Sequence, residues 1–282
     1  MNLLSIQSHV AYGHVGNSAA VFALQRLGTE VWPIHTVQFS NHTGYGSHKG
    51  DVFDAAMIRE VFDGIAARGV LAQCDGVLSG YMASAATGAA ILDIVARLRQ
   101  QNPGARYCCD PVIGDVTRGP YVAPDLAAFI KGRALAAADL VTPNQFELGF
   151  LTGRATATLA DLRAAVKLIH GRGPGVVLVT SLRTEETPDD ALDVLVSDDN
   201  GQYRLRTPLL PIKANGAGDL MAALFFLHYL RTASPPQAMA LAASALYGIL
   251  RRTAEAGASE MLLIEAQDEL VDPSRSFRPE AV

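Results

Sequence analysis

Short apolar runs alternate with longer helical patterns along most of this chain, and this alternation limits the folds open to it. Residues 3–7, 76–79 and 176–180 are apolar runs with the length of buried strands, and residues 85–101 have helical spacing. Strands that alternate with helices predict βαβ units, in which helices cover a mainly parallel sheet. We therefore predict an α/β fold built on a mainly parallel sheet.

The same pattern extends over 282 residues, a length sufficient for one large α/β domain or two small ones. Further strands are predicted over residues 30–37, 106–110 and 140–142, and an antiparallel hairpin over 192–197 and 202–207. Further helices are predicted over residues 17–27, 51–68, 124–132, 159–172, 218–230, 235–250 and 260–270. No repeat or linker interrupts the pattern. We therefore predict a single domain over residues 1–282, with a loosely ordered tail at 273–282.

Composition excludes several classes of function. The net charge is −5 and no basic block occurs, which argues against nucleic acid as a partner. No apolar run reaches the ~18 residues of a membrane span, and the first residues lack the basic segment of a signal peptide. Cys74, Cys108 and Cys109 are odd in number and form no Cys-x-x-Cys pattern, which favours reduced core thiols. We expect a cytoplasmic protein that acts on small molecules, with no nucleic acid and no membrane as partner.

A glycine-rich bend precedes the apolar run at residues 220–229. It reads Asn215-Gly216-Ala217-Gly218-Asp219. Small residues let the backbone approach a ligand closely, and the first N–H groups of a helix favour a phosphate. A carboxylate beside that phosphate is poorly placed to hold it, but well placed to take a proton from an attacking hydroxyl. The bend therefore indicates phosphoryl transfer to an alcohol.

The bend also fits a purely structural role. A Gly-x-Gly turn with an aspartate near the start of a helix is typical of a plain tight connection. The third glycine of a dinucleotide-binding fingerprint is missing. No Gly-x4-Gly-Lys-Ser/Thr run occurs, so any nucleotide phosphate is held without a P-loop lysine. The bend by itself therefore leaves both roles open.

Polar residues cluster where the predicted strands end. They are Ser8, His9, residues 40–43, Tyr81, Asp110, Asn144, Thr180 and Ser181. In open parallel sheets ligands bind at the carboxyl ends of the strands. The number of such ends favours one shared site, although scattered polar residues at strand ends are also common in proteins without one.

Several longer segments resemble the pyridoxal kinases of the ribokinase-like superfamily. The matching segments are residues 6–19, 36–45, 78–81, 109–115, 142–147 and 216–219. Gly216-Ala217-Gly218-Asp219 marks only the superfamily, which also phosphorylates sugars, nucleosides and hydroxymethylpyrimidine. Ser40-Asn41-His42-Thr43 and Ser79-Gly80-Tyr81 narrow the resemblance to the vitamin B6 branch. The resemblance implies a three-layer αβα fold and ATP-dependent phosphorylation of the 5′-hydroxyl of pyridoxal, which yields pyridoxal 5′-phosphate.

The resemblance also implies roles for individual residues. Asp219 would be the catalytic base, and the N–H groups of residues 215–218 would hold the γ-phosphate. The substrate-binding residues implied are Ser8, His42, Thr43, Gly44, Tyr81 and Asp219. Those implied around ATP are Asp110, Asp115, Thr142, Asn144, Glu147, Thr180, Ile212, Lys213, Ala214, Asn215, Gly216, Ala217 and Gly218. Asp110 and Glu147 are the implied Mg²⁺ residues, through water, and a monovalent cation such as K⁺ and a homodimer are further implications.

Alternatives remain for several of these residues and for the substrate. Ser8 is also explained by a hydroxyl-to-backbone bond at a strand end, Asp110 by a strand terminator before proline, and Glu147 by a position near a helix start. Lys213-Ala214-Asn215 is closer to the sugar and hydroxymethylpyrimidine kinases. A hydroxymethylpyrimidine or other small-alcohol kinase is therefore one alternative. A non-catalytic protein that binds pyridoxal phosphate is another. Residues 116–122 would form a flap over the nucleotide.

Overall fold

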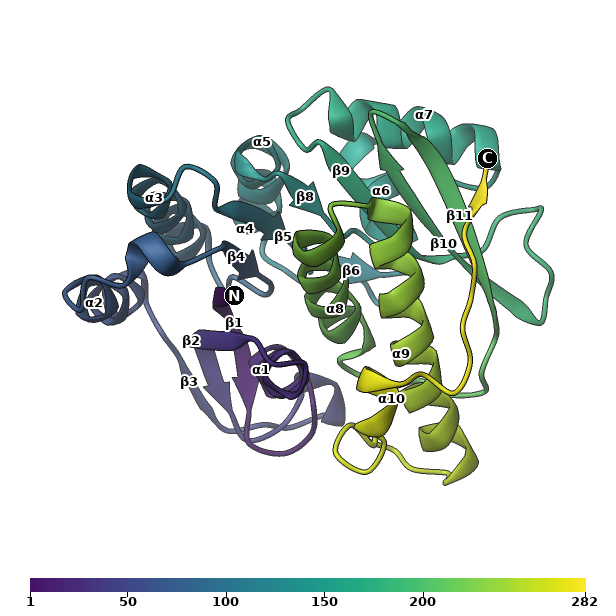
Figure 1. Ribbon diagram of the computed structural model, residues 1–282, viewed down its shortest axis with the longest axis horizontal. Coiled ribbons are helices and arrows are strands. Elements are labelled where there is room, and N and C mark those ends of the chain that lie inside the picture. The colour runs from purple at the N-terminus through teal and green to yellow at the C-terminus, as the bar shows by residue number, and fades with distance from the viewer.

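One ten-stranded sheet runs through the protein in the computed structural model, which describes all residues from 1 to 282. Its strand order is β12-β11-β10-β9-β8-β5-β4-β1-β2-β3. The strands from β9 through β8, β5, β4 and β1 to β2 are parallel to one another, and antiparallel strands lie at both edges. Helices cover both faces, as Figure 1 shows. The predicted α/β fold with a mainly parallel sheet is confirmed.

The elements have the following bounds. The strands are β1 Asn2–Val10, β2 Glu30–Phe39, β3 Gly50–Val52, β4 Gly76–Ser79, β5 Arg106–Cys109, β6 Gly114–Asp115, β7 Gly119–Pro120, β8 Leu140–Val141, β9 Val176–Leu182, β10 Ala191–Asp198, β11 Gly201–Pro208 and β12 Glu280–Ala281. The helices are α1 Asn17–Arg26, α2 Ala55–Ala66, α3 Ala85–Gln101, α4 Pro124–Phe129, α5 Leu135–Ala137, α6 Gln145–Thr152, α7 Leu159–His170, α8 Ala217–Thr232, α9 Pro235–Glu255 and α10 Asp268–Val271. β6 and β7 form a separate small hairpin.

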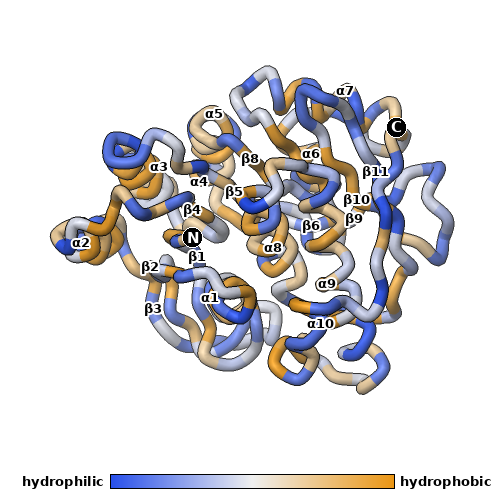
Figure 2. The backbone as a smooth tube through the Cα atoms, in the orientation of Figure 1, coloured by the Kyte–Doolittle hydropathy of each residue, from blue (hydrophilic) through white to orange (hydrophobic).

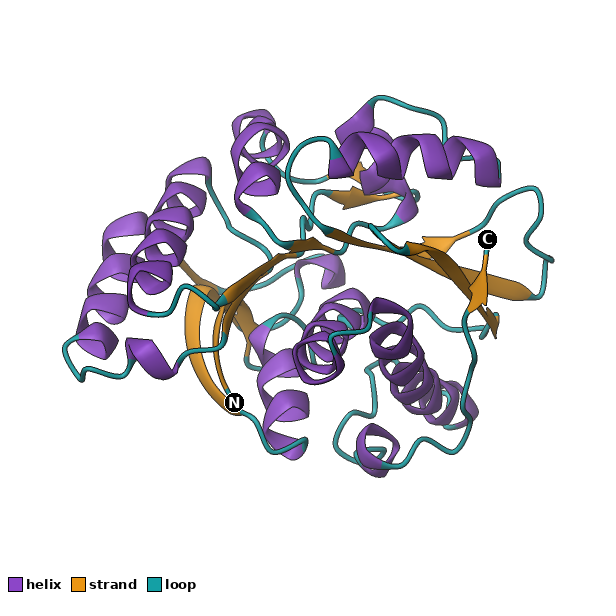
Figure 3. Ribbon diagram, turned by 45° about the horizontal axis from the view of Figure 1, so that its top comes forward, coloured by secondary structure: helices purple, strands orange, loops and turns teal.

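Two hydrophobic clusters fill the space between the sheet and its two helix layers. Successive strand residues point to opposite faces, so Leu4 and Val77 join one cluster while their neighbours Leu3 and Leu78 join the other. Side chains from α2, α3, α4, α6 and α7 complete the first cluster, and those from α1, α8 and α9 complete the second. Figure 3 shows the two layers of helices on either side of the sheet, and Figure 2 shows apolar residues on the central strands and on α8. The central strands are apolar throughout because both of their faces are buried.

Two predicted helices differ from the observed elements. Residues 50–52 form the edge strand β3, and α2 begins only at Ala55 because the Asp54 side chain accepts the N–H of Met57 as an N-cap. The helix predicted over residues 260–270 is mostly irregular, and only Asp268–Val271 is α-helical. Here apolar residues at helical spacing reflect burial of single side chains in loops.

The C-terminal residues make defined contacts, in contrast to the expectation of a loosely ordered tail. β12 pairs with β11 in antiparallel register. The backbone N–H of Phe277 donates to the hydroxyl of Ser244, and that of Val282 donates to the carbonyl of Gln202. These bonds hold residues 277–282 along the outer face of α9 and the edge of the sheet. No helix of the protein combines the length and apolar character needed to span a lipid bilayer.

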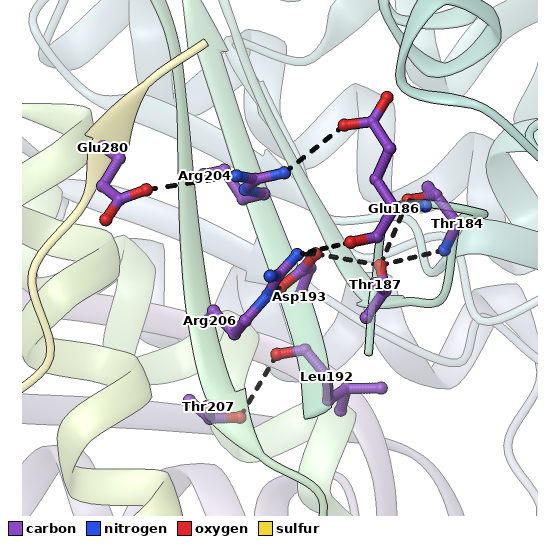
Figure 4. Close-up of polar contacts among 9 residues, drawn as sticks. All are labelled: Thr184, Glu186, Thr187, Leu192, Asp193, Arg204, Arg206, Thr207 and Glu280. Atoms are coloured by element: carbon purple, nitrogen blue, oxygen red, sulfur yellow. Dashed lines mark hydrogen bonds and ion pairs between the residues drawn. The ribbon is translucent and has the colours of Figure 1, made fainter. Parts of the chain in front are cut away.

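A polar network anchors the loop between β9 and β10, as Figure 4 shows. The Asp193 carboxylate is buried, with only 2% of its side chain exposed, and the Arg206 guanidinium binds both of its oxygens at 2.7 Å. The Thr187 hydroxyl donates to the same carboxylate at 2.9 Å. Arg206 also donates to the carbonyl of Glu186. The network therefore ties residues 186 and 187 of the loop to β10 and β11.

Arg206→Ala lowers the unfolding free energy by about 2 kcal/mol, because it leaves a buried carboxylate without its cation. The loss of unfolding free energy is smaller than for a fully buried ion pair because the Arg206 side chain is 35% exposed. Arg204 in the same strand is a matched control, since its ion pairs at 3.7 and 4.0 Å involve exposed carboxylates. Arg204→Ala costs less than about 1 kcal/mol. Urea unfolding measures both values, and equal losses would contradict this description of the network.

Candidate active site

The carboxyl ends of the parallel strands bring the candidate residues to one edge of the sheet. Ser8 lies near the end of β1, Asp110 directly follows β5, and Thr142 directly follows β8. Thr180 lies in β9 and forms an isolated parallel bridge with Asn144. The N-terminus of α8 reaches the same edge, because its first residues pack against the loop between β1 and α1. The candidate site is therefore at the topological position where ligands bind in open α/β sheets.

Gly216 makes the bend before α8 possible. Its φ is +83°, in the left-handed region that favours glycine, and it is the N-cap residue of the helix. A Cβ atom at this position would overlap the carbonyl oxygen of His14. The close approach of these two backbone segments places Asp219, in the first turn of α8, beside the loop of residues 13–16.

The Asp219 carboxylate lies inside this junction. Burial raises its pKa above the ordinary value for aspartate, and the nearby backbone N–H of Gly16 offsets part of the rise. The charge of Asp219 in turn helps to raise the pKa of Asp110. Asp219 is therefore close enough to Asp110 for its charge to affect the ionisation of the Asp110 carboxyl.

Asp110 and Glu147 form a buried acidic pair. Burial and the charge of Glu147 raise the pKa of Asp110 well above its usual range, although Thr142 donates a hydroxyl hydrogen bond to it at 3.0 Å. Glu147 accepts the backbone N–H groups of Ile113 at 2.7 Å and Asn144 at 2.9 Å. Burial nevertheless raises its pKa to about 7. Two desolvated carboxylates at one place favour a shared proton or a cation.

Glu147 gives the ligand-free protein a measurable pH dependence. Its pKa is about 7 in the folded state and about 4.5 in the unfolded chain, so the folded state binds more protons between these values. Its contribution to the unfolding free energy is therefore present at acidic pH and is lost as the pH rises through about 7. Glu147→Gln removes this slope. Unfolding curves of both proteins across that range test the assignment, and parallel slopes would contradict it.

The predicted substrate-side residues lie on three segments. Gly16, at φ +53°, packs so closely on Ser8 that a Cβ atom there would overlap the serine carbonyl and hydroxyl oxygens. His42 caps the short helix at Thr43–Tyr45, where its Nδ1 accepts the N–H of Gly44 at 3.2 Å. Burial and the nearby Arg118 lower the pKa of His42. Tyr81 follows β4 and is half-buried, and its carbonyl accepts the Thr36 hydroxyl.

The remaining predicted residues lie on the segments next to Asp110 and Glu147 or on the segment that precedes α8. Asn144 caps α6 and donates to the carbonyl of Gly114 at 2.8 Å. Asp115 forms an ion pair with Arg118 at 2.7 Å. Burial of Asp115 opposes ionisation, but the backbone N–H and guanidinium of Arg118 outweigh it and lower the pKa. Residues 212–215 lead into the bend, and Lys213 is exposed.

Sequence reasoning missed two features of the site. Tyr121 lies in the predicted flap with 44% of its surface exposed, and partial burial together with the charges of Glu147, Asp219 and Asp110 raises its pKa. The helix α6 was also missed, although its reciprocal bonds between Asn144 and Glu147 form a capping box. An Asn followed three residues later by Glu was the available signal for this helix. No local signal pointed to Tyr121, because its proximity to the carboxylates depends on the fold.

Comparison with known proteins assigns the family. The family model for phosphomethylpyrimidine kinase matches residues 35–263. The pyridoxal kinase PdxY of Granulibacter bethesdensis is 56% identical over 98% of this chain and 98% of its own length. The chain belongs to the pyridoxal kinase family. The PdxY of Deinococcus radiodurans is 54% identical over 100% of this chain and 96% of its own length. The protein is therefore an enzyme, a kinase that transfers a phosphoryl group, as the resemblance implied.

The structural comparison agrees with this assignment. Pyridoxal kinase from Leishmania donovani, solved in complex with ADP and pyridoxamine, has a TM-score of 0.92 and is 29% identical. The match covers 100% of this chain and 99% of the Leishmania chain. The predicted ribokinase-like αβα fold is confirmed.

Proposed function

We propose that this enzyme transfers the γ-phosphoryl group of ATP to the 5′-hydroxyl of pyridoxal and forms pyridoxal 5′-phosphate. The observation that carries the proposal is the position of the Asp219 carboxylate. It lies in the first turn of α8, behind a glycine bend, and close to Asp110 and the loop against Ser8. A base next to a phosphate-binding helix start is the arrangement that this reaction requires.

In this proposal Asp219 accepts the proton of the 5′-hydroxyl as the oxygen attacks phosphorus. The raised pKa strengthens Asp219 as a base, and the nearby N–H of Gly16 favours its charged form. Residues 215–218 present backbone N–H groups toward the charge that develops on the γ-phosphoryl oxygens. Such preorganised donors are commonly worth ~3 kcal/mol each. Phosphoryl transfer needs mostly this positioning and charge neutralisation.

The pyridine ring of the substrate is assigned to the segments near Ser8. The Ser8 hydroxyl makes no hydrogen bond within the protein, whereas Ser5, Gln7 and His9 on the same strand all do. It is therefore free to bond the ring nitrogen or the phenolic oxygen. Tyr81 offers an aromatic face to the ring. His42, Thr43 and Gly44 are assigned to the other side of the ring, and the lowered pKa of His42 favours its neutral form.

The nucleotide is assigned to the acidic pair and the segments around it. Mg²⁺ prefers carboxylate oxygens, phosphates and water, and Asp110 with Glu147 supplies two carboxylates. Burial raises the pKa of both, and repulsion by Glu147 adds to the rise at Asp110, so a cation would relieve the cost of their charges. Water and phosphate oxygens would complete the coordination of the ion. Residues assigned to contact ATP are Asp115, Thr142, Asn144, Thr180 and 212–218, and K⁺ is proposed as a further cation.

A second candidate activity is phosphorylation of hydroxymethylpyrimidine. The family model that matches this chain is that of phosphomethylpyrimidine kinase. The Lys213-Ala214-Asn215 segment also resembles the sugar and hydroxymethylpyrimidine kinases more than many pyridoxal kinases. Relatives that are 43–56% identical over at least 96% of their length are named pyridoxal kinases, which favours the first candidate. A purely pyridoxal phosphate-binding protein is the least favoured alternative, because Asp219 and its glycine bend are intact. We also propose a homodimer, which sedimentation analysis would test.

A substrate panel with Mg-ATP tests the proposed function. Pyridoxal, pyridoxine, pyridoxamine and hydroxymethylpyrimidine are supplied separately, and both ADP and the phosphorylated product are measured. The proposal predicts the highest kcat/KM with a B6 vitamer. Preference for hydroxymethylpyrimidine would favour the second candidate, and tight pyridoxal binding without ADP release would favour the binding protein.

A further inference from the structure

Asn17 is a buried polar residue at the first position of α1 for which the proposed chemistry gives no direct use. Its side chain is in the protein interior, with 1% exposure. The carboxamide oxygen accepts the hydroxyl of Ser5 at 2.7 Å. The amide nitrogen lies 3.1 Å from the carbonyl oxygen of Ile34 and 3.0 Å from Nδ1 of His35. The side chain thus bonds to β1 and to β2 at the same time.

His35 is in the ionisation state that this arrangement requires. Burial and the neighbouring His9 lower the pKa of His35 to about 4. The ring is therefore neutral, and Nδ1 accepts a hydrogen bond from Asn17. Both amide hydrogens and the carboxamide oxygen of Asn17 are satisfied. Because all of these hydrogen bonds form in the protein interior, they hold the Asn17 side chain in a single orientation.

The network continues to the other substrate-side segment. The Ser5 hydroxyl accepts the side-chain amide of Gln7 at 2.9 Å. The side-chain oxygen of Gln7 lies against Gly80, where a Cβ atom would come within 2.6 Å of it. Gly80 is followed directly by Tyr81. The hydrogen bonds therefore run from α1 to Gln7 on β1, and the Gln7 side chain packs against the residue that follows β4.

Gly16 connects this network to the reacting groups. It directly precedes Asn17, its backbone N–H is near enough to Asp219 to lower the pKa of that carboxyl, and its α-carbon packs on Ser8. A shift of Asn17 would move Gly16, and Gly16 contacts both the proposed base and the proposed ring-binding hydroxyl. Ser18, the residue after Asn17, donates its hydroxyl to the carbonyl of Val10 at 2.6 Å. Asn17 and Ser18 therefore fix the start of α1 to β1 at two points.

We infer that Asn17 is a positioning residue, which holds Gly16 so that Asp219 and Ser8 converge on the substrate alcohol and ring. Asn17 itself does not contact the substrate. The inference rests on the proposed function, since it gives Asn17 a role in placing the groups of that reaction. It adds a residue from the 6–19 segment to which the proposed chemistry assigns no function.

Kinetics of Asn17→Ala and Ser5→Ala test the inference, with Asn102→Ala as a matched control. Asn102 also bonds through both ends of its carboxamide, to the carbonyl of Cys74 and the N–H of Gly104, before β4 and β5 at the opposite edge of the sheet. We expect Asn17→Ala to lower kcat with pyridoxal by about 10- to 100-fold, as a small misplacement of reacting groups does. The KM for pyridoxal rises and the KM for ATP does not. Ser5→Ala removes the bonds of the Ser5 hydroxyl to Asn17 and Gln7 but leaves the bonds of Asn17 to β2, so it has a smaller effect in the same direction.

The control separates positioning from stability. All three variants lower the unfolding temperature, but Asn102→Ala keeps wild-type kcat and KM values. Folded Asn17→Ala with a wild-type kcat would overturn the inference. If Asn17→Ala does not fold, the same kinetic comparison is made with Ser5→Ala. A wild-type kcat for that variant would then overturn the inference. A wild-type enzyme that did not phosphorylate pyridoxal would instead overturn the proposed function, and the inference with it.

Discussion

Asp219→Asn lowers kcat with pyridoxal by about 10²- to 10⁴-fold, the usual contribution of a positioned general base. Asparagine has nearly the same shape and keeps a side-chain oxygen at this position, but it cannot take a proton at neutral pH. The phosphate contacts assigned to residues 215–218 come from backbone N–H groups, so the KM for ATP changes little. Steady-state assays that detect ADP give both constants.

Asp161→Asn is the matched control for this variant. Asp161 occupies the same position in α7 as Asp219 does in α8, the third residue of the helix. It accepts only from Thr158, in the capping box of α7. Its replacement weakens the cap by about 1 kcal/mol and leaves kcat unchanged. Equal kcat values for wild type and Asp219→Asn would show that the base is another group.

Gly216→Ala lowers kcat/KM by about 10²-fold or more, because a displacement near 1 Å at the reacting groups has effects of that size. The alanine Cβ atom would overlap the carbonyl oxygen of His14, and the φ of +83° is unfavourable for alanine. The bend must move away from the loop of residues 13–16. Asp219 then loses its contact with Gly16, and the N–H groups of the bend change direction.

Gly28→Ala separates steric overlap from backbone strain. Gly28 has a φ of +74°, but a Cβ atom there meets nothing within 4 Å. Both variants carry left-handed strain of about 1–2 kcal/mol. Only Gly216→Ala alters the site, so Gly28→Ala lowers the unfolding free energy and keeps kcat/KM. Wild-type kcat/KM for Gly216→Ala would contradict the proposed role of the bend.

The order and type of most elements could be predicted because the core is built from local patterns. Strands β4, β5 and β9 are short apolar runs buried on both faces, and α3 and α7 carry their caps and apolar faces in contiguous sequence. The segment at 260–270 misled the prediction because buried loop residues imitate helical spacing. The short strand β3 escaped prediction because all three of its residues are exposed.

The site was predictable only in part. Asp219, Asp110 and Glu147 belong to sequence segments that resemble the pyridoxal kinases. In the structure the charges of Glu147 and Asp219 lie close enough to Asp110 to raise its pKa. Gly16 and Tyr121 lie near those carboxylates in loops that are distant in the sequence from Asp219, and no local pattern encodes such proximity. The roles assigned to all of the site residues, those of Asp219, Asp110 and Glu147 included, stay predictions, because they concern contacts with ligands.

A crystal structure with pyridoxal and a non-hydrolysable ATP analogue tests the central claim most directly. The quantity to measure is the distance from the Asp219 carboxylate to the 5′-oxygen of pyridoxal. We predict a hydrogen bond of about 3 Å, with the γ-phosphate in front of the N–H groups of residues 215–218. An Asp219 side chain that faces away from the alcohol, with another base at that distance, would contradict the account.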